Sequence, residues 1–172
     1  MAVATAFVGC DKLRELQTKP PVVLKSADGK AQITIGPGWK ERKELNAEAV
    51  LQAAYGSRDM YVVILSENKE DFRSMTLERY WEGRRQHILK GVDKPTETAP
   101  VKLTIGGCPA VQSQIAGFSK NDIKLVRVLT IVESPKRYYQ IFAWTIGSKF
   151  AGNEADLQTV IRSLKTTDDE KK

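Results

Sequence analysis

A run of strand-like segments closed by one amphipathic helix, spanning residues 101–164, most constrains what this chain can fold into. The segments 124–132 and 138–146 are rich in β-branched and aromatic residues, and the turn-forming stretch 134–137 separates them, so we predict a hairpin. Nearly every position in both segments is apolar, whereas a strand with one solvent-exposed face alternates apolar and polar residues. We therefore predict that they lie centrally in a sheet that is covered at least partly on both sides.

Other segments predict further strands of an antiparallel sheet. Residues 101–105 alternate apolar and polar side chains, and Gly106-Gly107 then allows a tight reversal into a strand over 110–117. Together with the hairpin above, this makes at least four antiparallel strands. Earlier in the chain, the turn sequence 27–30 between two short apolar segments, 22–26 and 31–35, predicts a hairpin.

A second early hairpin is expected from residues 49–66. The alanines, Leu51 and Gln52 within 49–55 favour helix, but the segment leads through a glycine turn into the clear strand 60–66, which favours a strand pair. Trp39 follows Gly36-Pro37-Gly38 and is expected at the edge of the core. Residues 93–100 contain turn-forming types and are predicted to be a loop.

Two helices are expected to flank the sheet. The first is capped by Thr76, runs to about Lys90 and ends before Gly91; one face of it carries Leu77, Tyr80, Trp81, Arg84 and Ile88. The second follows Asn153, which we interpret as its N-cap. Its sheet-facing side chains are Leu157, Val160, Ile161 and Leu164, while Gln158, Arg162 and Lys165 are expected to point away.

Length and charge restrict the class of protein. A chain of 172 residues suits one domain, which we place at residues 22–165, after a leader and polar tether over 1–21 and before a disordered tail over 166–172. The net charge is +6, but basic and acidic residues alternate along most of the chain. This alternation argues against a nucleic-acid partner.

The first ten residues resemble the end of a bacterial lipoprotein signal peptide, in which a small or apolar triplet precedes an obligatory cysteine. Gly9 and Cys10 match that pattern, Val8 is tolerated, and Phe7 departs from it because leucine is usual there. The basic segment that begins such signals is missing, so this interpretation assumes a native start upstream of residue 1. The alternative is an ordinary N-terminus with a chance cysteine.

The signal resemblance implies a lipid anchor and a location. The thiol of Cys10 would receive a diacylglyceryl group before cleavage makes it the new N-terminus, and Asp11 after it resembles the signal for retention at the inner membrane. The domain is then expected to face the periplasm. Cys10 is therefore the predicted lipid-attachment residue and Asp11 the predicted sorting residue.

No catalytic or metal-binding set is evident in the sequence. The single histidine, His87, has only Glu78 and Glu82 as nearby oxygen donors, at a spacing that matches no recognised metal motif, so we expect a surface or boundary histidine. Cys108 has neither a Cys-x-x-Cys partner nor a basic neighbour, and we expect it to be buried. We predict no enzymatic activity, no catalytic residues, no metal, no cofactor and no small-molecule substrate; an enzyme of unknown type stays open as an alternative.

Two other features have plain structural interpretations. Gly36-Pro37-Gly38 and Gly106-Gly107 do not precede helices, so they are expected to form turns instead of phosphate-binding loops. Aromatic side chains beside Lys136 and Arg137 could stack nucleic-acid bases, but filling of the core explains them more simply. These aromatic residues are Tyr138, Tyr139, Phe142 and Trp144.

The order of elements resembles the PsbP-like fold over residues 22–165: an early hairpin, a helix after Thr76, three long strands in succession, and a last helix with apolar residues at 157, 160, 161 and 164. That family includes the PsbP protein of the oxygen-evolving complex, a Ran-GTPase-binding protein, and small envelope lipoproteins of the DcrB kind. The resemblance implies an α+β architecture, an α/β sandwich with a twisted, mainly antiparallel sheet flanked by helices. It implies no catalytic residues.

Two functions of different class follow from this resemblance. DcrB-type lipoproteins also join a lipid signal to such a domain by a polar tether, which implies a non-catalytic envelope lipoprotein that binds or supports other envelope proteins. The alternative is a cytoplasmic chaperone-like adaptor that binds hydrophobic segments of a secreted protein. Neither interpretation identifies the partner.

Overall fold

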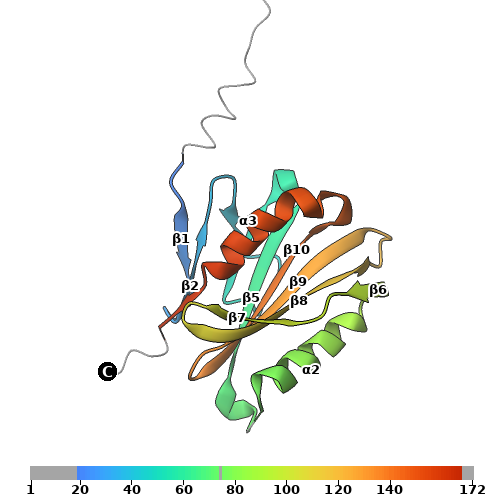
Figure 1. Ribbon diagram of the computed structural model, residues 1–172. Coiled ribbons are helices and arrows are strands. Elements are labelled where there is room, and N and C mark those ends of the chain that lie inside the picture. Colours follow the sequence, from blue (N-terminus) through green and yellow to red (C-terminus); the bar gives the residue numbers. More distant parts are fainter. Residues whose placement is uncertain (1–18, 74, 168–172) are drawn as a thin grey trace, which may run out of the picture.

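The computed structural model describes residues 19–73 and 75–167, which form two antiparallel sheets and two α-helices (Figure 1). Within these residues the main sheet has eight strands in the order β3-β4-β5-β10-β9-β8-β6, with β7 also paired to β8, and the small sheet has the order β1-β2-β11. The bounds are β1 Val22–Lys25, β2 Ala31–Ile35, β3 Lys40–Glu41, β4 Leu51–Tyr55, β5 Met60–Asn68, α2 Leu77–Leu89, β6 Asp93–Glu97, β7 Val101–Ile105, β8 Cys108–Phe118, β9 Lys124–Glu133, β10 Arg137–Ile146, α3 Phe150–Arg162 and β11 Lys165–Thr166. The architecture confirms the α+β prediction.

Strands β9 and β10 lie in the middle of the main sheet and are covered on both faces, as predicted. Alternate side chains along a strand point to opposite faces. Val128 and Val132 therefore pack in the cluster that contains the buried face of α3, whereas Leu129 and Ile131 pack against α2. This explains why both strands are apolar at nearly every position.

The predicted hairpins are confirmed. Strands β1 and β2 pair across the turn at residues 27–30, and β4 pairs with β5, so the ambiguous segment 49–55 is a strand. Strands β7 and β8 pair across Gly106 and Gly107, whose φ angles of 57° and 84° suit glycine. Trp39 is buried at the edge of the core, as expected.

Helix α2 agrees with the prediction from its cap and apolar face. The backbone N–H of Arg79 donates to the side chain of Thr76, and the helix ends at Leu89. Its buried side chains Leu77, Tyr80 and Trp81 pack on β8, β9 and β10. The helix therefore covers one face of the main sheet with the residues that were expected to face it.

Helix α3 begins earlier than predicted, and Asn153 is not its N-cap. The helix starts at Phe150, directly after a short 3-10 turn at Gly147–Lys149, so Asn153 lies inside it. Its side chain is 3% exposed and bonds to Arg58 and Thr145. Asparagine was mistaken for a cap because the sequence does not show the distant groups that satisfy it.

The predicted apolar face of α3 is otherwise confirmed. Leu157, Val160 and Ile161 are buried, and Leu164 is buried just after the helix. Gln158 does not point away, because its Nε2 donates to Oε1 of Gln112 on β8 at 2.9 Å. Residues Ile33 and Ile35 of β2 join the same apolar cluster, so α3 and the small sheet together cover this face.

Residues 93–100 are not a loop throughout, because residues 93–97 form the edge strand β6. All five of its residues are exposed, and its pairing with β8 shifts register between Asp93 and Thr96. An exposed, irregular edge strand with a proline has no alternating apolar pattern, so its sequence resembled a loop.

Strand β11 extends one residue beyond the predicted end of the domain. Thr166 pairs with Ala31, and the N–H of Thr167 donates to the carbonyl of Lys30 at 3.1 Å. Thr166 and Thr167 therefore bond to the small sheet and do not belong to the predicted tail, whose other residues lie outside the described ones. None of the helices in the described ranges has the length and hydropathy needed to cross a membrane.

Candidate binding site beside helix α2

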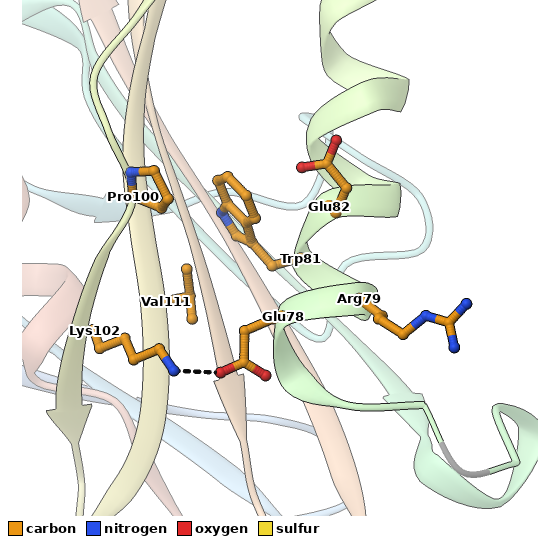
Figure 2. A pocket seen from close by; sticks show the side chains of 7 residues that line it. All are labelled: Glu78, Arg79, Trp81, Glu82, Pro100, Lys102 and Val111. Atoms are coloured by element: carbon orange, nitrogen blue, oxygen red, sulfur yellow. Dashed lines mark hydrogen bonds and ion pairs between the residues drawn. The ribbon is translucent and has the colours of Figure 1, made fainter.

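A cavity of about 450 Å³ opens between α2 and the edge of the main sheet (Figure 2). Trp81 extends from the sheet-facing side of α2, Val111 faces it from β8, and Pro100 closes the side formed by the sheet edge. Figure 2 shows the indole ring reaching across toward Pro100, while Arg79 points away from the space. The remaining lining residues are Glu78, Glu82 and Lys102.

The cavity exists because the edge of the sheet is interrupted between β6 and β7. Thr98 still bonds to Gln114, through its backbone N–H and through its hydroxyl. Ala99 and Pro100 belong to neither strand, and pairing resumes where Val101 lies opposite Gln112. Proline has no N–H to offer a neighbouring strand. The interruption leaves a short part of the edge of β8 without a regular neighbouring strand, and Pro100 from this segment lines the cavity.

Two ion pairs join α2 to the sheet edge on either side of Trp81. Lys102 Nζ lies 2.6 Å from Glu78 Oε1 (Figure 2), and Arg85 binds Glu97 of β6. The hydrogen bond from Lys102 lowers the pKa of Glu78, and that from Arg85 lowers the pKa of Glu97. The side chains of Lys102 and Glu78 are 77% and 53% exposed, so water screens this pair and it contributes little to stability. It can open without much loss of stability.

Two buried polar atoms beneath α2 lack a hydrogen-bond partner among the described residues. One is Nε1 of Trp81, a residue that is only 7% exposed. The other is Oγ of Ser113, two positions along β8 from Val111 and on the same face. A buried polar group without a partner costs about 1–3 kcal/mol. Both atoms have almost no accessible surface and Ser113 does not line the cavity, so they belong to the packing of α2 on the sheet.

Neighbouring cavities extend this site into a groove along α2. A cavity of about 560 Å³ shares Glu78 and Lys102 with it, and one of about 370 Å³ shares Trp81, Glu82 and Pro100. We call the three joined cavities, between α2 and residues 97–111, the α2 groove. Its walls combine apolar side chains with acidic and basic groups that already pair with one another.

A separate cavity of about 410 Å³ lies on the other side of α2. Its floor is a buried network in which the hydroxyl of Tyr80 donates to Glu67 and accepts from Gln140, and Arg84 binds the same carboxylate. Burial, followed by the hydrogen bond to Glu67, raises the pKa of Tyr80. Because these polar groups satisfy one another, they make a structural floor.

The two residues predicted for lipid attachment and sorting, Cys10 and Asp11, lie outside the described residues. His87 is exposed on α2 and lines the separate cavity of about 410 Å³, in agreement with the predicted surface histidine. Its expected neighbours Glu78 and Glu82 instead pair with Lys102 and Arg85. Residues 19–73 and 75–167 contain no cluster of three or more histidine, cysteine or acidic side chains placed to hold a metal ion.

Cys108 is buried, as predicted, and its Sγ lies 3.8 Å from Oγ1 of Thr166. The two glycine-rich segments are turns that do not precede helices. Tyr138 and Tyr139 are fully buried, which confirms their role in the core. The aromatic rings of Phe142 and Trp144 are only partly buried and line the separate cavity of about 410 Å³.

Sequence reasoning placed Trp81 on the inner face of its helix but missed the groove beside it. The break in the edge strand at residues 98–100 creates the groove, and this segment was interpreted as part of a loop. Pro100 was the available signal, because a proline interrupts backbone pairing. The unpartnered state of the indole N–H depends on the packing of α2 against β8, which no local pattern reveals.

A central antiparallel sheet with one helix on each face and a preceding hairpin is the PsbP-like fold, and similar solved structures confirm this class. The cyanobacterial PsbP of Synechocystis sp. PCC 6803 superimposes with a TM-score of 0.63 at 9% identity, covering 95% of this chain and 98% of that one. LpqN of Mycobacterium tuberculosis gives 0.62 at 12% identity over 89% and 95% of the two chains, and the Saccharomyces cerevisiae Ran-binding protein Mog1p gives 0.60 at 10% over 88% and 97%.

These likenesses show the fold alone, because their sequence identities are low. No protein-family model matches the sequence, and no curated protein matches it either. The DcrB-type relationship stays a prediction from the sequence. The three similar structures are a cyanobacterial PsbP, a mycobacterial protein described as involved in cell envelope biogenesis, and a yeast Ran-binding protein.

Proposed function

We propose that this chain is a non-catalytic lipoprotein of the bacterial envelope, whose domain faces the periplasm and binds or supports other envelope proteins through the α2 groove. The groove is the observation that carries the proposal, since it combines apolar side chains, Trp81 among them, with ion pairs at its rim. Buried aromatic side chains and a fully desolvated centre are typical of protein-binding hot spots. We expect neither nucleic acid nor a small-molecule substrate as the partner.

The chemistry of the groove supports binding more than catalysis. Its carboxylates are held by cations, as in the pairs Glu78–Lys102 and Glu97–Arg85, and these interactions lower their pKa values. A general acid at neutral pH needs a raised carboxyl pKa. A groove with apolar walls and charges already paired at its rims resembles an interface with an apolar centre and a polar border.

The anchoring part of the proposal rests on the signal-like sequence that ends at Cys10. Residues 11–21 would reach at most about 40 Å when extended, which keeps the domain close to the membrane. Acyl chains on Cys10 would exceed the two signals that stable attachment needs. Structural similarity to LpqN, described as involved in cell envelope biogenesis, supports an envelope role, and Asp11 supports the inner membrane.

Replacement of Cys10 by serine tests the anchor. The variant should leave the membrane fraction, and the intact mass of the parent, but not of the variant, should include the lipid. Cys108→Ser is the matched control, because Cys108 is buried and should not affect the distribution. A Cys10→Ser protein that stays as membrane-bound as the parent contradicts the lipid anchor.

A photo-crosslinker at position 102 tests the groove. Lys102 lies on the wall of the groove, whereas Lys40 lies on β3 at the opposite end of the main sheet and serves as the control position. In membranes, position 102 should crosslink a defined envelope protein and position 40 should not. Equal crosslinking at both positions would argue against the groove as the binding site.

A second candidate is a cytoplasmic adaptor that holds hydrophobic segments of a secreted protein. The similarity to Mog1p, a Ran-binding protein, supports this class because it shows the same fold in a protein that binds another protein. The α2 groove would serve this function equally well. Finding the chain in the soluble cytoplasm with Met1 intact would favour it over the lipoprotein.

A further inference from the structure

The small sheet has one face in the core and one face in solvent. Leu24 of β1 and Ile33 of β2 lie opposite each other, and both are buried in the apolar cluster that contains α3. Adjacent positions along a strand point to opposite faces. Lys25 and Gln32, the next pair, therefore point to solvent, and Lys165 of β11 lies across from Gln32 in the same row. We call the face that carries this row the outer face of the small sheet.

The outer face of the small sheet is positively charged. Lys25 and Lys165 are exposed, and none of the ion pairs between described residues includes either of them. Two strand spacings of about 4.8 Å separate their backbones, so both ammonium groups can reach one flat surface. Strands β1, β2 and β11 contain no acidic residue, and Asp28 in the turn between β1 and β2 is held by Arg137 at 2.8 Å. No acidic group of these strands therefore offsets the two lysines.

Exposed apolar side chains lie beside these lysines. Val22 and Val23 are 53% and 49% exposed, and they are the only sequence neighbours among the five large apolar residues that are exposed in the described ranges. They belong to β1, which has a free edge at the outside of the small sheet (Figure 1). Val23 shares the outer face with Lys25, two positions away. Apolar groups next to long cationic side chains suit the boundary of a lipid bilayer, where the charge stays in water.

The place of β1 in the chain favours a bilayer as the partner of this face. With the proposed lipid on Cys10, residues 11–21 reach at most about 40 Å, and β1 is the first strand that follows them. The small sheet and α2 pack on opposite faces of the main sheet, in separate apolar clusters. A domain that rests on the small sheet therefore keeps the α2 groove open toward other proteins.

We propose that the outer face of the small sheet rests on an anionic phospholipid bilayer, with Lys25 and Lys165 at the headgroup phosphates and Val23 at the interface. This inference rests on the proposed lipid anchor and names the surface that the anchor brings to the membrane. A lysine near an anionic surface strengthens binding about fivefold. Two lysines are too weak to retain a chain without lipid, so the face orients an anchored domain, and the Cys10→Ser protein should still leave the membrane fraction of cells.

The test uses the full chain with Cys10→Ser, which carries no lipid, and sedimentation with vesicles of phosphatidylcholine and phosphatidylglycerol. At a salt concentration of about 0.01 M, charges interact over about 30 Å, and the chain should sediment with these vesicles. It should not sediment with vesicles of phosphatidylcholine alone. Lys25→Glu combined with Lys165→Glu should weaken binding about 25-fold, from about fivefold for each lysine.

Lys90→Glu combined with Lys120→Glu is the matched control, because it changes the net charge equally. Lys90 is exposed at the end of α2, and Lys120 is exposed in the turn between β8 and β9, whereas Lys165 lies beside the turn between β7 and β8. The control should weaken binding by no more than about fivefold. Equal losses in the two double variants, equal binding to uncharged vesicles, or no binding would overturn the inference. The acidic residues 168–170 lie outside the described ranges and stay in the chain, so neutralisation of the lysines by them would also appear as equal losses.

Pairing of β1 with a second copy of the chain is the competing use of its free edge. Light scattering of the chain without vesicles should show a monomer. A dimer that Val23→Asp disrupts would assign β1 to self-association and overturn the inference. Because the chain on the vesicles has no lipid, a failure there leaves the anchor to be judged by fractionation, and the two proposals can fail separately.

Discussion

Replacing Asn153 by alanine tests whether a buried side chain inside α3 joins the helix to the end of β10 and to the turn before β5. Its Nδ2 donates to the carbonyl of Arg58 at 2.9 Å and to Oγ1 of Thr145 at 2.8 Å. Its Oδ1 accepts from Nε of Arg58 at 3.1 Å. Thr145 is fully buried, so the alanine variant removes a partner that water cannot easily replace.

The expected loss of stability follows from these three hydrogen bonds. Each contributes a net of about 0.5–1.5 kcal/mol, which gives about 1.5–4.5 kcal/mol for the set. Alanine has a better helix propensity than asparagine by about 0.5 kcal/mol, and this gain offsets part of the loss. We therefore expect Asn153→Ala to lower the free energy of unfolding by about 1–4 kcal/mol.

Urea denaturation followed by tryptophan fluorescence measures this change. Asn121→Ala, at an exposed position in the turn between β8 and β9, is the control and should change the free energy of unfolding by less than about 0.5 kcal/mol. If Asn153→Ala also stays within that limit, the hydrogen bonds do not stabilise the fold. Asn153 would then be no more than a tolerated polar residue in the helix.

Three further predictions concern other parts of the structure. Ile161→Asp should unfold the domain in thermal melting, since an isolated buried carboxylate costs several kcal/mol at a fully buried position; a melting temperature within a degree or two of the parent refutes the assigned face. The raised pKa of Tyr80 means that the unfolded chain loses this proton first, so stability should fall as pH rises above about 10. Tyr80→Phe should make that fall shallower in urea titrations, and an unchanged slope contradicts the assignment. Gly106→Ala should destabilise more than Gly107→Ala in the same assay, because both have positive φ but only a Cβ at 106 would meet the carbonyl oxygen of Leu164, at 2.6 Å; equal losses would show that this contact does not matter.

The parts of the fold that the sequence predicted are those with strong local patterns. Strands β9 and β10 carry apolar side chains on both faces, because other elements pack on each face of the sheet. The sequence alone shows this pattern. Helix α2 was recognised from the cap at Thr76 and its apolar face. Strand β6 was missed because all of its side chains are exposed, so it lacks the alternation that marks a half-buried strand.

The candidate site could be predicted only in part, because it depends on contacts between distant segments. The sequence placed Trp81 on the buried face of its helix. The cavity beside its ring is also lined by Pro100, which lies outside the strands, and the sequence does not show that these two residues meet. The bonding of Asn153 depends on Arg58, which is 95 positions away in sequence. Neither relation repeats at a fixed spacing, so no periodic pattern could indicate it.

The geometry of the main sheet explains why α2 has a cavity on each side. A helix about 10 Å wide covers roughly two strands spaced about 4.8 Å apart, so α2 alone leaves the flanking strands open on its face. The opposite face is covered more fully, because α3 and β2 share one apolar cluster. On the β5 side of α2 the network of Tyr80, Glu67 and Gln140 satisfies its own polar groups. On the β7 side the α2 groove has apolar walls with ion pairs at its rim, which is why we propose that side for protein binding.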